Sequence, residues 1–246
     1  MNVILLYKTI ANDVFSRAEI AKAAKHIDPS FKESQLRFYI GKLKNENLIV
    51  SVGRNRYSKN LSLKKRYIPQ KTETCEKIIA TIKNEYPFIS YRVWDLNCLN
   101  EFLNHLLAQN HIFLEVEKDG LEFIYEKLKD IFPNKILLNP SKKEIEIYSE
   151  PDDIIILPLT SESPTGTNSE NEISLEKLIV DLFTNKTLQT FVSKGDYPQA
   201  LEDMFEKYSI NEIKLFRYAR RRNKAKEIYD FICEKTNIKL TVEVKG

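Results

Sequence analysis

Three short helical patterns follow one another closely in the first 46 residues. An apolar stretch over residues 3–10 predicts one helix, and Ser16 with Glu19 has the spacing of a capping box that opens a second over residues 17–24. Ser-Phe-Lys-Glu at residues 30–33 repeats that spacing and predicts the start of a third helix. So many helix signals in so short a segment restrict its fold to a small helical domain.

A strand, a turn and a returning strand come next. Residues 48–52 have the composition of a strand, residues 53–55 read Gly-Arg-Asn, and residues 56–58 form the return. Three helices followed by a hairpin is the element order of a winged helix-turn-helix domain. We expect this domain over residues 1–70.

The third helix is amphipathic. At 100° per residue, Leu36, Ile40 and Leu43 share one stripe, and small, amide, aromatic and basic side chains lie opposite. Such side chains reach base edges and phosphates in a major groove, and arginines at a hairpin tip contact phosphates or a minor groove. The predicted DNA-binding residues are Lys32, Ser34, Gln35, Arg37, Phe38, Lys42, Arg54, Arg56 and Lys59. In the alternative reading, the domain is purely structural and Phe38 is covered by the next domain.

The charge distribution supports DNA binding. Residues 1–70 contain 14 lysines and arginines against 5 aspartates and glutamates, a balance of +9. Residues 71–171 have a balance of −8 and residues 172–246 one of +2, so the whole chain has only +3. A basic segment joined to an acidic one is typical of a polyanion-binding module attached to a body with another role.

Residues 43–57 resemble the recognition-helix end and the wing of AbiEi-type antitoxins, which are transcriptional regulators of AbiE toxin-antitoxin systems. The wing of that family usually reads Gly-Arg-Gly-x-Tyr, and Asn55 stands here in place of the second glycine. Because asparagine tolerates positive φ better than most residues, we expect the turn to be kept. Residues 174–183 and 214–222 are similar to the two helices that close AbiEi-like proteins.

Residues 71–160 alternate between helical and strand patterns and predict a central α/β domain with a small mixed sheet. Phe88, Tyr91 and Trp94 are interpreted as aromatic residues that pack on this sheet. The expected helices cover residues 73–85, 96–107 and 121–132, and the expected strands cover residues 88–94, 112–116, 136–138, 144–148 and 154–157.

No catalytic or metal-binding pattern is complete in this sequence. A metal-dependent nuclease would need Glu-x-Lys on one strand face, whereas Glu115, Glu117 and Lys118 put two carboxylates on one face and the lysine on the other. The glycines are too scattered for a phosphate-binding loop, and Cys75, Cys98 and Cys233 are too far apart for a zinc motif. We therefore expect a protein that is not an enzyme and has no cofactor or metal.

Residues 161–173 are rich in small polar residues and are expected to form a flexible, exposed linker. Beyond it, residues 174–246 predict a C-terminal helical region, with helices beginning near residues 174, 197, 211 and 224. The fold class expected is therefore α+β and multi-domain. Lys214, Arg217, Arg220 and Arg221 are the candidate partner surface, and helix-end charges or a second phosphate contact are the alternatives.

The resemblance implies an antitoxin and transcriptional autorepressor that binds double-stranded DNA at its own promoter. It also implies phage defence and an AbiEii-like nucleotidyltransferase toxin as functional partner, with direct contact left open. A DNA-processing enzyme and a ligand-sensing transcription factor remain alternatives. The sequence lacks a signal-peptide pattern and a long apolar run, so we expect a cytoplasmic protein without membrane contact.

Overall fold

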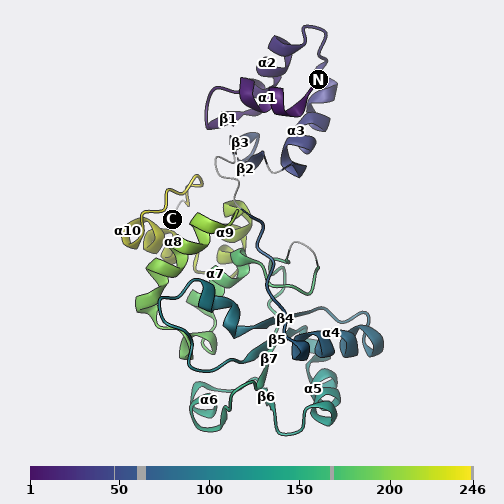
Figure 1. Cartoon of the computed structure of the whole chain (residues 1–246), viewed down its shortest axis with the longest axis vertical. Coiled ribbons are helices and arrows are strands. Elements are labelled where there is room, and N and C mark those ends of the chain that lie inside the picture. The colour runs from purple at the N-terminus through teal and green to yellow at the C-terminus, as the bar shows by residue number, and fades with distance from the viewer. Residues whose placement is uncertain (47, 60–64, 167–168, 245–246) are drawn as a thin grey trace.

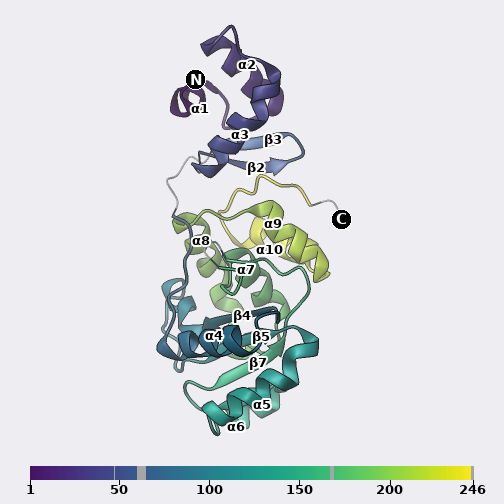
Figure 2. The same cartoon turned by 90° about the vertical axis from the view of Figure 1, so that its right-hand side faces the viewer.

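The computed structural model describes residues 1–46, 48–59, 65–166 and 169–244. Residues 1–59 form a small N-terminal unit and residues 65–244 form a larger body. The two parts lie end to end in an elongated molecule (Figures 1 and 2). Each part has its own apolar core. Over the described residues, the fold is a mixed α+β structure with one three-stranded and one four-stranded sheet.

The N-terminal unit contains three helices and a small antiparallel sheet. Its elements are α1 (Val3–Thr9), β1 (Val14–Ser16), α2 (Arg17–Ile27), α3 (Leu36–Asn45), β2 (Ile49–Gly53) and β3 (Arg56–Lys59). The sheet order is β1-β3-β2, so the hairpin pairs with a short strand between α1 and α2 that the sequence pattern did not reveal. Three predicted helices and the predicted hairpin are confirmed.

The two predicted capping boxes of this unit have different outcomes. The first is confirmed, because the Ser16 side chain accepts the Glu19 N–H while Glu19 accepts the Ser16 N–H. The second is wrong: the N–H and Oγ of Ser30 both donate to the Asp28 carboxylate, at 2.9 and 2.6 Å. The Asp28 carboxylate, only two residues away, takes both hydrogen bonds of Ser30, so Ser30 does not cap a helix. A 3-10 turn at Glu33–Gln35 precedes α3 instead.

The body is built on a small mixed sheet, as predicted, and its four described strands lie in the order β4-β5-β7-β6. Strand β4 is antiparallel to β5, whereas β7 is parallel to both β5 and β6. The elements up to the end of the sheet are α4 (Glu73–Glu85), β4 (Tyr91–Asp95), β5 (Ile112–Val116), α5 (Leu121–Ile131), β6 (Ile136–Leu138), α6 (Lys142–Tyr148) and β7 (Ile154–Pro158). The C-terminal helices are α7 (Leu175–Thr184), α8 (Tyr197–Lys207), α9 (Glu212–Arg221) and α10 (Ala225–Lys235).

Helices cover both faces of this sheet. Because side chains alternate along a strand, Ile112 and Leu114 pack with α4 and α5, whereas Phe113 packs with the C-terminal helices. Trp94 on β4 stacks on Phe113, with ring centroids 4.6 Å apart, and belongs to the same core as Phe113 and the C-terminal helices. The body is therefore a layered α/β/α structure, and its C-terminal helices share a core with the sheet (Figure 1).

Two predicted elements of the body are wrong. Residues 144–148 were expected as a strand because Glu-Ile-Glu-Ile alternates, but they lie in α6, which a capping box between Ser141 and Glu144 begins. Residues 96–107 were expected as one helix, but only a 3-10 helix at Leu96–Glu101 forms. The Asn100 side chain accepts the N–H of Leu107 at 2.8 Å, so a side-chain bond replaces continued helical bonding.

The aromatic residues expected on the sheet do not all pack there. Tyr91 and Trp94 are buried in the body, as predicted. Phe88 lies before β4 and is 95 % exposed, so its assignment to the sheet is wrong. The residue follows Pro87 in a turn, and the strand begins three residues later.

The predicted linker is packed against the body over much of its described length. Ser163 and Glu172 are buried, Lys71 pairs with Glu172 at 2.7 Å, and the N–H of Val93 donates to the carbonyl of Asn171 at 3.1 Å. The expectation of an exposed connection is therefore wrong for these residues, because Lys71 and the backbone of Val93 hold this segment against the body. Residues 167 and 168 of this segment, like residues 60–64 of the predicted first domain, lie outside the described residues.

Candidate nucleic-acid interface

Helix α3 separates an apolar face from a polar one. Leu36, Ile40 and Leu43 are buried in the core of the N-terminal unit, as predicted. The opposite side remains exposed, with Arg37, Phe38 and Lys42 on the helix and Lys32, Ser34 and Gln35 on the turn before it. Burial of one stripe therefore fixes which side chains point away from the molecule.

The exposed face of α3 combines an aromatic ring with a nearby cation. Phe38 is 59 % exposed, so the described part of the body leaves its ring open, and the Nζ atom of Lys42 lies 4.9 Å from its ring centroid. A Cβ atom added at Gly41 would have no atom within 4 Å apart from its chain neighbours and the backbone of its own helix. This part of the helix can therefore approach a large ligand closely.

Gln35 has a local partner as well as an exposed position. Its Oε1 atom accepts the N–H of Lys32 at 3.2 Å and thereby holds the 3-10 turn before α3. Its amide nitrogen can still donate outward, as a side chain that reads a base edge must. Ser34 lies in the same turn and is exposed.

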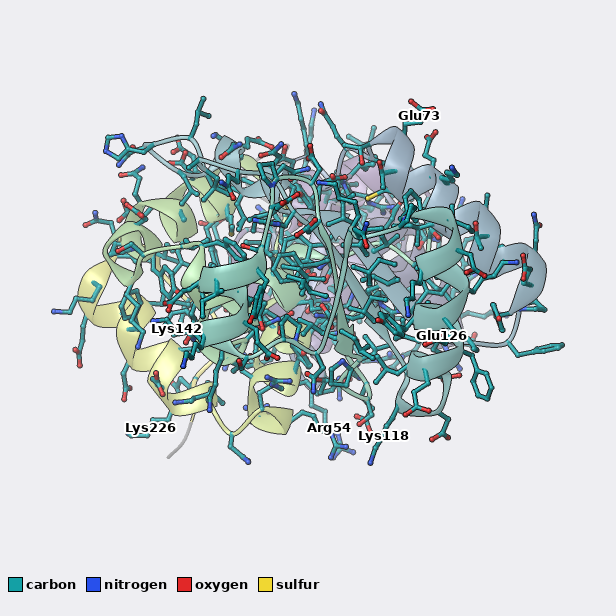
Figure 3. The ribbon with its side chains drawn as sticks, turned by 90° about the horizontal axis from the view of Figure 1, so that it is seen from below. Arg54, Glu73, Lys118, Glu126, Lys142 and Lys226 are labelled. Carbon is teal, nitrogen blue, oxygen red and sulfur yellow. The ribbon has the colours of Figure 1, made fainter. Side chains whose placement is uncertain are left out.

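The turn of the β2–β3 hairpin has the predicted geometry. Asn55 adopts φ of 56°, which is the left-handed conformation that the missing glycine would supply. The Asn55 carbonyl accepts the N–H of Arg17 at 2.9 Å, which ties the turn to the start of α2. Arg54 and Arg56 flank the turn and are exposed, and Figure 3 shows Arg54 pointing outward at the rim of the molecule.

Lys59 lies apart from the other predicted residues. It is at the far end of β3, where its Nζ atom lies 5.6 Å from the ring centroid of Tyr7. It also lines a groove that contains Glu202 and Glu206 of α8. Lys59 therefore lies at the boundary between the N-terminal unit and the body and is not part of the exposed α3 face.

The four C-terminal basic residues differ in their exposure and in their hydrogen bonds. Arg217 and Arg220 are exposed on α9, while Leu215, Phe216 and Ala219 are buried. Lys214 donates to the carbonyl of Thr165 at 2.7 Å, and Arg221 donates to the hydroxyl of Ser161. Lys214 and Arg221 thus each form a hydrogen bond to the segment that precedes α7.

A buried ion cluster that the sequence patterns did not predict joins the sheet to α7. Lys177 contacts Glu115 at 2.6 Å and also pairs with Asp181, which accepts a hydrogen bond from the Tyr218 hydroxyl. Burial alone would lower the pKa of Lys177, but the carboxylates of Asp181 and Glu115 outweigh it and raise the pKa. The available signal in the sequence was a Lys and an Asp four residues apart in a helix that is mostly apolar.

This cluster also determines the role of Glu115 on β5. Its carboxylate is buried against Lys177, while Glu117 lies beyond the strand and Lys118 begins a short 3-10 helix. The three residues therefore do not converge on one site. Among the described residues, no three His, Cys, Asp or Glu side chains are placed to hold a metal ion together.

The fold and the exposed basic face define a two-part α+β protein with a candidate binding surface on its N-terminal unit. The chain belongs to a family of unknown function (DUF6577), whose model matches residues 35–238. The match includes α3, the hairpin and the body as far as residue 238, beyond the end of α10. No curated protein matches the chain. Within the described residues, no helix is both long and apolar enough to span a membrane.

Proposed function

We propose that this protein is a DNA-binding transcriptional regulator whose N-terminal unit is a winged helix-turn-helix domain. The observation that carries the proposal is the shared exposure of the α3 face and the hairpin turn, in the segment with the basic balance of +9. Helix α3 enters the major groove with Ser34, Arg37 and Phe38 facing the bases. Arg54 and Arg56 contact phosphates or the minor groove beside it.

The first test is the salt dependence of DNA binding by the full chain, measured by fluorescence anisotropy with a labelled duplex. The logarithm of affinity falls with the logarithm of salt at a slope of about −0.9 per phosphate contact. Replacing Arg54 and Arg56 by alanine should therefore reduce that slope by about 1.8 if each makes one contact.

The matched control replaces Lys83 on α4 and Lys235 on α10, which are exposed basic residues of the body. Their replacement by alanine removes the same charge but should leave the slope unchanged. Absence of DNA binding at low salt would contradict the proposal, as would equal slope changes in the two double variants.

Within this class, we propose an AbiEi-like antitoxin that represses its own promoter and counters an AbiEii-like nucleotidyltransferase toxin in phage defence. The support is the resemblance of residues 43–57, 174–183 and 214–222 to that family. Arg217 and Arg220 form the exposed basic surface on α9 that would serve the antitoxin role.

The antitoxin proposal predicts that repression and toxin neutralisation depend on different residues. Replacing Arg217 and Arg220 by alanine should abolish growth rescue of cells that express the partner toxin, while promoter repression persists. Replacing Arg54 and Arg56 should have the reverse effect, because those residues lie on the N-terminal unit. Both activities are measured in one reporter strain, and loss of both in either variant would contradict this division.

A ligand-sensing regulator is the second candidate, and a cavity between the N-terminal unit and the body favours it. A DNA-processing enzyme has less support. The carboxylate on β5 that such a reaction would use is paired with Lys177 inside the body. Purified protein with magnesium or manganese should therefore leave plasmid DNA intact.

A further inference from the structure

A polar cavity of about 330 Å³ lies where the N-terminal unit meets the body. The end of α3 and strand β2 form one side, and the first residues of α7 and α9 form the other. Three basic side chains from separate segments line it: Lys44 at the end of α3, Arg66 between the two parts, and Lys214 on α9.

The charge of this cavity is positive. Glu176 is the one carboxylate among its described lining residues, and its Oε1 atom already accepts the N–H of Asn211 at 2.9 Å. Lys44 has its Nζ atom 5.1 Å from the centroid of the Tyr57 ring, a contact that leaves its ammonium donors available. Lys214 also donates to the carbonyl of Thr165, but it keeps its charge, so three cations against one carboxylate leave a positive balance that favours an anionic occupant.

Two helix ends and two serines also border this cavity. Ser174 caps α7 and Asn211 caps α9, so the N-terminal ends of two ten-residue helices border the same cavity. The positive ends of helix dipoles attract anions, and phosphate is a frequent ligand at such positions. Ser51 and Ser209 also line the cavity.

We propose that this cavity binds the phosphate group of a small phosphorylated molecule. A phosphate offers oxygen acceptors in several directions, which matches cations and hydroxyls supplied from opposite walls. The volume is near the lower end of that of ordinary ligand pockets, so it accommodates a phosphate monoester rather than a large cofactor. Because Lys44 comes from α3 and Lys214 from the body, an occupant links the candidate DNA-reading helix to the C-terminal helices.

The test is calorimetric titration of the full chain in a phosphate-free buffer at constant ionic strength. One series uses inorganic phosphate and a second uses adenosine 5′-monophosphate, so that a free anion and an ester are distinguished. Lys44→Gln should weaken the binding of either probe about tenfold, as expected for the loss of a charge-assisted hydrogen bond. Lys83→Gln on α4 removes the same charge far from the cavity and should leave binding unchanged.

Lys214→Gln provides a second variant, and its thermal unfolding is measured in parallel because Lys214 also holds the Thr165 carbonyl. Weaker binding in both cavity variants, with Lys44→Gln retaining the parent's unfolding temperature, supports the proposal. The proposal is overturned if neither probe binds at millimolar concentration, or if Lys44→Gln binds as well as the parent protein. No DNA is present in these titrations, so their result is independent of the test of DNA binding.

Discussion

At the scale of single residues, two positions show how local chemistry and burial act differently. Asn55 takes a left-handed backbone conformation that its short polar side chain tolerates. The turn that it forms can therefore be predicted from the adjacent residues of the sequence. Lys177, by contrast, would be expected at the surface, because lysine is seldom fully buried. Its role exists only because β5 brings Glu115 to it from 62 residues away.

Replacement of Lys177 should reveal the energetic role of the buried cluster. Lys177→Ala leaves Glu115 and Asp181 buried without a cation, which should cost about 3–5 kcal/mol of unfolding free energy. Lys226→Ala on α10 removes a lysine with the same i,i+4 spacing to an aspartate, but that pair is exposed and should contribute less than about 1 kcal/mol. Urea denaturation compares the two, and equal losses would show that the cluster is not effectively buried.

At the scale of secondary-structure elements, α3 illustrates a helix with two separate tasks. One side supplies core residues to the N-terminal unit, and the other presents the candidate DNA-binding face. Because the two sides share one backbone, substitutions should separate stability from binding.

Phe38→Ala and Leu36→Ala test this separation. Phe38 is exposed, so its loss should change the unfolding free energy by no more than about 0.5 kcal/mol and weaken DNA binding. Leu36 is fully buried, and its truncation should cost about 2–5 kcal/mol. Thermal unfolding and anisotropy are measured on both variants. A strongly destabilised Phe38→Ala protein would mean that the ring packs against the molecule.

At the scale of the whole molecule, the sheet and the C-terminal helices form one folding unit. Trp94, Phe113 and Ile155 on the sheet share a core with Leu178 and Ile179 of α7. The N-terminal unit has a core of its own, which contains residues from α1 to β3. Removal of the C-terminal helices should therefore damage the body and leave the N-terminal unit folded.

A chain that ends at Leu159 tests this expectation. It should expose the sheet face that α7 normally covers, so the emission of Trp94, the one tryptophan of the protein, should shift to longer wavelength. The shorter chain should also aggregate, while its N-terminal unit still binds DNA at low concentration. Native-like emission and a cooperative unfolding transition would show instead that residues 65–159 fold without α7 to α10.

The sequence by itself determined the features that depend on neighbouring residues. The helix at residues 73–85, the strand at residues 112–116 and the geometry of Asn55 were predictable from periodicity, capping and turn chemistry. The amphipathic pattern also predicted which side of the third helix is exposed, and therefore most of the candidate DNA-binding face.

Only the tertiary structure decided the features that depend on distant partners. The polar stretch before α7 packs because Lys71, Val93 and α9 offer it hydrogen bonds, and none of these partners is adjacent in sequence. The same holds for the pairing of Glu115 with Lys177, and for the cavity that brings Lys44 near Lys214. Local patterns fix the torsion angles and the exposed face of an element, but long-range burial decides which polar side chains find a partner.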